Sequence, residues 1–155
     1  MSIVLRNADR QILKSGEIMK EITVLVPNKV GALADVTEAL GNNGVNIESI
    51  SAQGFGNQGV IRIITSDEKS AMHALTKMAA SKEGYEIKMG EVLTITMADK
   101  PGELAKIARK ISRAGVNLEC IYQLRKDHEV QLVIKPENLI EAAAALKKGG
   151  LEFKI

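Results

Sequence analysis

A stretch that ends an apolar strand and opens a helix occurs twice in the chain, 71 positions apart. Residues 26–34 read VPNKVGALA and residues 97–105 read MADKPGELA. At the same offset, ten of the 29 positions in residues 22–50 are identical to those in residues 93–121. A shared period of this length indicates a duplicated domain. We therefore predict two domains of related fold.

Apolar residues alternate or follow helical spacing in the same order in both copies. The expected elements of the first copy are a strand through Ile22, Val24 and Val26, a helix from Gly31 to about residue 43, strands at 45–55 and 60–65, a helix at 70–80 and a strand at 85–89. The second copy repeats them as a strand at 93–97, a helix after Gly102, strands at 116–125 and 129–134, a helix at 136–148 and a strand at 152–155. This order predicts the α+β class, with two ferredoxin-like βαββαβ sandwiches in tandem, each an antiparallel sheet with its helices on one face.

The repeat also sets the expected domain boundaries. Residues 1–17 lie outside it and show no clear period, so we interpret them as an N-terminal arm or an extra strand. The first domain is predicted over residues 18–89 and the second over residues 90–155. Each is a small domain with a thin core.

Composition and charge exclude several classes of function. The formal net charge is +2, and basic residues are interleaved with acidic ones, so we expect no nucleic-acid partner. No run of about 20 apolar residues exists, and the start of the chain lacks an apolar signal core, so we expect no membrane partner and a cytoplasmic location. The single cysteine, Cys120, rules out an internal disulfide.

The motifs that would indicate an enzyme fail their context tests. Residues 54–59 spell GxGxxG, but a strand rather than a helix follows, which predicts a glycine-rich hairpin instead of a dinucleotide site. His73 and His128 have no catalytic or metal-binding partner nearby in sequence, and the equivalent Glu48 and Glu119 are expected to be solvated. We therefore predict a protein that is not an enzyme, with no cofactor and no metal.

Four polar residues recur at the ends of the first helix of each copy. Asn28 and Asp99 lie at the strand-to-helix turn, and Asn46 and Asn117 lie just after the helix. Free backbone N–H groups at a helix start, beside a short polar side chain, attract a small anionic or zwitterionic ligand. The alternative is purely local, because Asn and Asp are good turn residues that hydrogen-bond the nearby backbone.

These motifs resemble those of the ACT domains, which are small amino-acid-sensing modules. The residues DKPGEL at 99–104 and GVNL at 115–118 match the signature, while the first copy departs from it with Val30 in place of proline. The chain is similar to stand-alone tandem ACT proteins, which carry no attached enzyme. The resemblance implies amino-acid binding where two such domains meet, by Asn28, Val30, Gly31 and Asn46 in the first copy and by Asp99, Pro101, Gly102 and Asn117 in the second.

The function implied is that of a non-catalytic regulatory sensor, acting on a separate metabolic enzyme or transport system, in a protein expected to form a homodimer. Few aromatic residues favour a small or aliphatic amino acid as the ligand. A helix of about 13 residues spans roughly 20 Å, so Asn28 and Asn46 of one domain cannot both touch one small ligand. One alternative is an adaptor that pairs with a partner protein through sheet edges and binds no small molecule. RNA binding on the sheet is disfavoured because aromatic stacking platforms are lacking.

Overall fold

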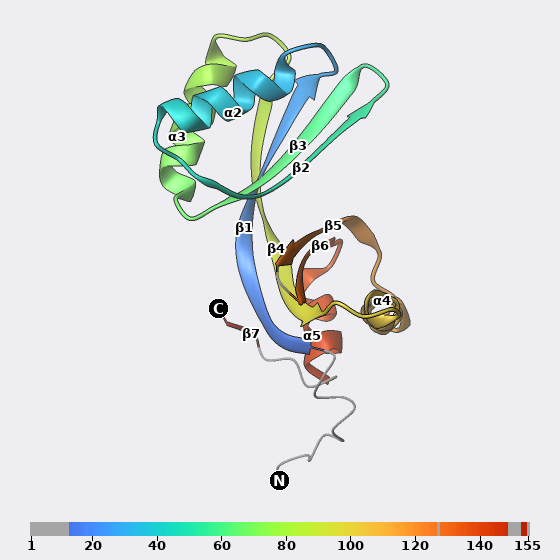
Figure 1. Ribbon diagram of the computed structural model, residues 1–155. Coiled ribbons are helices and arrows are strands. Elements are labelled where there is room, and N and C mark those ends of the chain that lie inside the picture. The colour runs from blue at the N-terminus through green and yellow to red at the C-terminus, as the bar shows by residue number, and fades with distance from the viewer. Residues whose placement is uncertain (1–12, 127, 149–152, 155) are drawn as a thin grey trace. The chain divides into compact units, whose positions relative to one another are not determined.

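The computed structural model describes residues 13–126, 128–148 and 153–154, which fall into two compact units (Figure 1). The continuous unit consists of residues 20–90. The split unit combines the described residues up to Met19 with those from Glu91 onward. Both are of the α+β class, with antiparallel strand pairs and helices.

The described residues form the following helices and strands, in sequence order. They are β1 (Leu13–Pro27), α2 (Ala32–Asn42), β2 (Ile47–Phe55), β3 (Gln58–Thr65), α3 (Glu68–Ala80), β4 (Glu86–Ala98), α4 (Glu103–Arg113), β5 (Leu118–Lys126), β6 (Glu129–Pro136), α5 (Leu139–Lys148) and β7 (Phe153–Lys154). Two of the strands, β1 and β4, contribute residues to both units.

In the continuous unit the strands lie in the order β2-β3-β1-β4, and β3 is antiparallel to both of its neighbours. The register sets Ile22 opposite Ile63 and Val24 opposite Ile61, so these four side chains share one face of the sheet. Helices α2 and α3 cover that face (Figure 1). The core forms between them from these side chains and from others of the same kind, which are Val26, Ala32, Val36, Leu40, Val45, Ala71 and Leu75.

The split unit repeats this arrangement with the order β5-β6-β4-β1. Leu93 lies opposite Ile134 and Ile95 opposite Leu132 in the antiparallel pair of β4 and β6. Their side chains pack against α4 and α5 in one buried cluster, to which the helices contribute Ile107, Ile111, Ala142, Ala143 and Leu146. The predicted spacing of the apolar residues on α4 is confirmed for Ile107 and Ile111.

Residues 13–19, most of which the sequence placed in an arm outside both domains, form the first part of β1 within the split unit. The Thr94 hydroxyl donates to the Glu17 carbonyl at 3.2 Å, and Ile18 packs against the core of this unit. Strand β7 pairs in parallel with β1, with Phe153 opposite Gly16. Residues 1–12 of the predicted arm lie outside the described residues. The divisions at 19/20 and 90/91 fall within two residues of the predicted boundaries.

The glycine motif at residues 54–59 is a hairpin, as predicted, in which Gly56 and Asn57 join β2 to β3. Helices α2 and α4 are both followed by a glycine at positive φ, Gly44 at 70° and Gly115 at 74°. This confirms the helix end predicted near residue 43, because glycine tolerates the left-handed conformation that follows a helix. The predicted domain boundary between residues 89 and 90 falls inside a strand, since β4 runs through it without a break.

Candidate functional site

The turn between β1 and α2 leaves the start of the helix without a side-chain cap. Gly31 occupies the N-cap position with φ at 92°, and the first helical hydrogen bond runs from the Asp35 N–H to the Gly31 carbonyl at 2.9 Å. Within the described part of the chain, the N–H groups of Leu33 and Ala34 have no hydrogen-bond partner. Such free donors at the positive end of the helix dipole favour an anionic group.

Asn28 connects this turn to the hairpin between β2 and β3. Its backbone N–H donates to the Asn57 carbonyl at 2.9 Å, and its side-chain Nδ2 donates to the Gly56 carbonyl at 2.9 Å. Its Oδ1 atom has no hydrogen-bond partner among the described residues. Asn28 therefore has the structural role that the sequence left open as an alternative, and it keeps one acceptor available.

A pocket of about 170 Å³ lies between this turn, the start of α2 and the hairpin. Its lining residues are Val26, Pro27, Asn28, Lys29, Ala32, Leu33, Ala52, Gln53, Gly54, Gly59, Val60 and Ile61, all of the continuous unit. Small residues on the strands leave this space open. A Cβ atom at Gly54 would lie 2.8 Å from Asn28 Nδ2, and one at Gly59 would lie 2.9 Å from Val26 Cγ2. The pocket is smaller than the roughly 300–1,000 Å³ of drug-sized sites, so it suits a small ligand.

The other predicted residues of the first copy lie elsewhere. The side chain of Val30 is fully exposed, and neither Val30 nor Gly31 lines the pocket. Asn46 is exposed beyond the opposite end of α2 and does not line it either. The structure thus places Asn28 at the pocket, together with Lys29 and Leu33, which the sequence did not nominate.

The matching turn of the split unit has the same backbone geometry. Gly102 is the N-cap of α4 with φ at 87°, and no side chain caps that helix. The Asp99 N–H donates to the His128 carbonyl at 3.2 Å, which parallels the bond between Asn28 and the hairpin turn. Pro101 is exposed and precedes the N-cap. The recurrence of glycine at both N-caps follows from their positive φ, which a residue with a Cβ atom rarely adopts.

The side chains of Asp99 and Asn117 have different partners. Asp99 Oδ2 lies 3.5 Å from Arg125 Nε. Asn117 Nδ2 donates to Glu137 Oε1 at 3.0 Å, and the Asn117 carbonyl accepts the Glu137 N–H at 2.9 Å. Asn117 therefore ties the start of β5 to the segment before α5.

Glu103, in the first turn of α4, is a residue that sequence reasoning missed. Only 9% of its side chain is exposed. Its Oε1 atom lies 3.0 Å from Lys106 Nζ. Its Oε2 atom is buried without a hydrogen-bond partner among the described residues. An unpaired buried oxygen is costly, which makes this carboxylate a candidate acceptor for a cationic group. The sequence did contain a signal that could have identified Glu103. The equivalent residue 71 positions earlier is Ala32, a small residue that lines the pocket of the continuous unit.

A polar cluster fixes the first turn of α2 from outside. Tyr85 donates its hydroxyl hydrogen to Asp35 Oδ2 at 2.8 Å, and Lys82 Nζ lies 3.3 Å from the same oxygen. The Tyr85 hydrogen bond, followed by the nearby lysines, lowers the pKa of Asp35. Burial, together with the bond to Asp35, raises the pKa of Tyr85 from 10.0 to about 12. The Asp35 carboxylate therefore stays ionised near the uncapped helix start.

Two absences hold for the described residues as a whole. No group of three or more His, Cys, Asp or Glu side chains is placed to hold a metal ion. None of the helices is long and apolar enough to cross a membrane.

Residues 20–80, which make up most of the continuous unit, match the ACT domain family. The comparison with curated proteins finds no significant match.

Several solved structures share the fold over most of the chain. A protein from Bacteroides thetaiotaomicron is 26% identical, with a TM-score of 0.77 over 88% of this chain and 92% of its own. The ligand-free regulatory subunit of aspartate kinase from Thermus thermophilus is 19% identical, with a TM-score of 0.66 over 90% and 97% of the two chains. Aspartate kinase from Clostridium acetobutylicum is 18% identical, with a TM-score of 0.59 over 88% of this chain and 35% of its own.

Proposed function

We propose that this protein is a non-catalytic regulatory sensor that binds a small amino acid beside the β1–α2 turn and acts on a separate metabolic enzyme or transport system. The observation that carries the proposal is the 170 Å³ pocket at the uncapped start of α2, lined by both Asn28 and Lys29. The ACT match supports it, because ACT domains bind amino acids. The likeness in fold to an aspartate kinase regulatory subunit is consistent with it.

The polar groups of this pocket complement the two charges of an amino acid. The ligand carboxylate would accept hydrogen bonds from the free N–H groups of Leu33 and Ala34, with the Lys29 ammonium group nearby. The ligand ammonium group would donate to Asn28 Oδ1, the acceptor that the hairpin bond leaves available. Both contacts use atoms that have no partner in the described part of the chain.

The apolar part of the lining favours an aliphatic side chain. Ala32, Leu33, Ala52 and Val60 present methyl groups to the pocket, and no aromatic ring is among its lining residues. Burial of a few methyl or methylene groups contributes about 0.8 kcal/mol each. The limited volume then selects against large side chains.

We propose that a second ACT-like domain completes the site with the Asn that follows its first helix. Helix α2 has 11 residues, which is about 17 Å of helix, so Asn46 cannot reach a small ligand held beside Asn28. Asn117 is the equivalent residue of the second copy. The completing domain belongs to a second copy of the chain in a homodimer.

The test is thermal denaturation against the twenty amino acids, followed by calorimetry with the one that raises the midpoint most. A ligand that binds only the folded state must raise the midpoint by mass action. Lys29→Ala should lower its affinity, whereas Lys77→Ala, on the exposed surface of α3, should not. No shift with any amino acid at millimolar concentration, or equal loss in both variants, would contradict the proposal.

The alternative function is that of an adaptor that pairs through a sheet edge and binds no small molecule. It is favoured by the exposed Ile50 and Phe55 on β2, a strand at the edge of its sheet. Under this alternative, Asn28→Ala would leave partner binding intact. Ile50→Lys would abolish it.

A further inference from the structure

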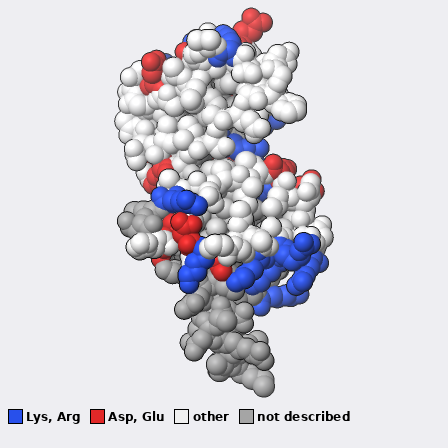
Figure 2. Space-filling view, turned by 45° about the vertical axis from the view of Figure 1, so that its right-hand side comes forward, with Lys and Arg blue, Asp and Glu red and all other residues white. Residues whose placement is uncertain are grey.

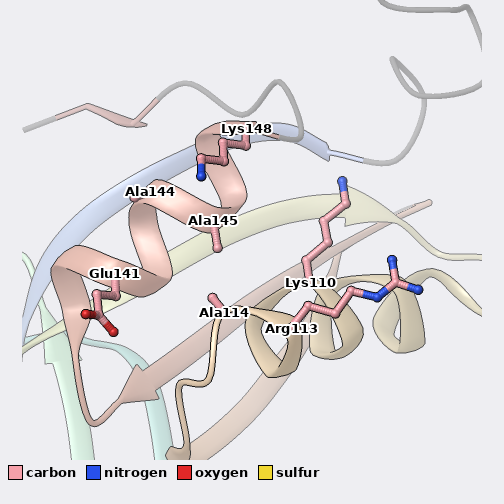
Figure 3. A pocket seen from close by; sticks show the side chains of 7 residues that line it. All are labelled: Lys110, Arg113, Ala114, Glu141, Ala144, Ala145 and Lys148. Carbon is pink, nitrogen blue, oxygen red and sulfur yellow. The ribbon is translucent and has the colours of Figure 1, made fainter.

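A groove of about 550 Å³ lies between α4 and α5 of the split unit. Figure 3 shows Lys110 and Arg113 projecting from α4 and Lys148 from the end of α5. The other residues that line the groove are Ala114, Ala144, Ala145 and Glu141. The groove exists because alanines stand where larger side chains would close the space between the helices. It therefore combines an apolar floor with a mainly basic rim.

The positive charge of the rim is not neutralised by the described residues of the unit. Lys110, Arg113 and Lys148 form no salt bridge with any residue that the structure describes. Helices α4 and α5 together carry six basic and two acidic residues, whereas α2 and α3 carry two basic and three acidic residues. Figure 2 shows Lys and Arg side chains gathered on the side of the split unit that carries α4. This groove therefore attracts a negatively charged partner.

The α5 wall of the groove differs from the matching helix α3, 71 positions earlier. Ile140 corresponds to Lys69, and Ala144 corresponds to His73. Ile140, Ala144 and Lys148 are spaced by four residues, so they share one face of α5. The Ile140 side chain is 79% exposed. At positions 140 and 144 this face is apolar in the split unit, whereas the equivalent positions in the continuous unit are polar.

The α4 wall differs from α2 in the opposite sense. Lys110 corresponds to Ala39, and Arg113 corresponds to Asn42. Relative to the equivalent helices of the continuous unit, the α4 wall is thus more charged and the α5 wall is more apolar at these positions. Packing within a unit needs neither change, since the buried positions of α4 and α2 correspond, with Ile107 at the position of Val36.

The lining indicates a macromolecular partner rather than a metabolite. A small-molecule site usually has buried polar groups that converge on the ligand. Here the Arg113, Glu141 and Lys148 side chains are exposed on the rim, and the floor is made of alanine methyl groups. Small floor residues allow the close approach of another helix, and an exposed large side chain such as Ile140 serves as an anchor.

The geometry points to this groove as a docking site for an acidic amphipathic helix of a partner protein. The apolar face of that helix would pack on the alanine floor and against Ile140. Its Asp and Glu side chains would pair with Lys110, Arg113 and Lys148. Glu141 sets the orientation, because it repels acidic residues at the α5 start and favours them at the other end. This surface goes beyond the amino-acid site and would be a contact with the regulated target.

The test is a selection from a displayed library of 18-residue amphipathic helices with a fixed leucine stripe and random polar positions. We expect the wild-type protein to enrich helices rich in Asp and Glu. The affinity of an enriched peptide, measured by fluorescence anisotropy, should fall about tenfold or more in Lys110→Glu/Arg113→Glu. The matched double variant Lys69→Glu/Lys77→Glu on α3 should bind the peptide like the wild type. Ile140→Ser should also weaken binding, although it leaves the net charge unchanged.

Other outcomes would overturn the proposal. These are no enrichment, enrichment of neutral or basic helices, or equal loss of affinity in the α3 control. If the protein enriches no helix but binds phosphatidylglycerol vesicles or single-stranded RNA, with the same loss in the α4 variant, the basic surface serves another polyanion. Circular dichroism of each variant separates loss of binding from loss of folding.

Discussion

The Oδ2 atom of Asp99 lies 3.5 Å from Nε of Arg125, so the carboxylate of this predicted ligand-binding residue already has a cation beside it. Both side chains are partly exposed, and water screens their attraction. A ligand that uses Asp99 must therefore compete with Arg125. The two equivalent turns differ in this competition, because the Asn28 side chain is uncharged and forms no ion pair.

The first prediction concerns this pair. Asp99→Asn replaces an ionic hydrogen bond with a weaker neutral one, and we expect ligand affinity at the split-unit turn to fall by about tenfold, or about 1.4 kcal/mol. Arg125→Ala should have the opposite sign, because it frees the carboxylate. Calorimetry with the amino acid that most raises the thermal midpoint measures both. Unchanged affinity in Asp99→Asn would remove Asp99 from the site.

The second prediction concerns Glu103. Replacing it with alanine, the residue at the equivalent position 32, removes a buried unpaired oxygen that costs about 1–3 kcal/mol. We expect Glu103→Ala to raise the free energy of unfolding in urea, despite the loss of the contact with Lys106. Binding of a cationic group at this turn should weaken at the same time. The exposed Glu119→Ala is the control, and a Glu103→Ala protein less stable than the wild type would contradict the argument.

The third prediction concerns the glycines that keep the pocket open. A methyl group at Gly54 would collide with the Asn28 side chain and displace it, so Gly54→Ala should weaken amino-acid binding and lower the free energy of unfolding by about 1–3 kcal/mol. Gly41→Ala in α2 is the matched control. No atom lies within 4 Å of its added Cβ atom, so it should stabilise the protein by about 0.5–1 kcal/mol. Chemical denaturation and calorimetry of both variants provide the comparison.

The fourth prediction is a pH dependence. The folded-state pKa of Tyr85 is raised from 10.0 to about 12, so the stability contributed by its neutral hydroxyl is present below pH 10 and is lost as the pH rises toward 12. Tyr85→Phe should abolish this part of the loss. The chain has two tyrosines, and Tyr122→Phe is therefore the control. Absorbance titration in which Tyr85 ionises near pH 10 would contradict the prediction.

Local sequence signals were sufficient for most elements of the fold. The alternation of Ile22 and Val24 set the inner face of β1, and the spacing of Ile107 and Ile111 set the inner face of α4. Gly44 marked a helix end because few other residues adopt its backbone conformation. Each of these signals acts over a few neighbouring residues, so the sequence alone contains it.

Features that depend on distant packing could not be predicted in this way. Residues 13–19 read LKSGEIM, which has no clear period, and they form a strand only because another part of the split unit pairs with them. The burial of Glu103 contradicts the usual exposure of glutamate, so no local pattern predicted it. Asn28 was identified at the turn, but its bond to the Gly56 carbonyl depended on how closely the hairpin approaches.

The insertion of residues 20–90 between the two segments of the split unit has a consequence for biosynthesis. Residues 13–19 leave the ribosome more than 70 residues before the strand segment 91–98 that belongs to their unit. Contacts that are distant in sequence form slowly, and an unpaired strand edge is prone to association with other chains. Nascent chains halted at residue 90 should therefore protect residues 13–19 poorly from proteolysis, while residues 20–90 are already resistant.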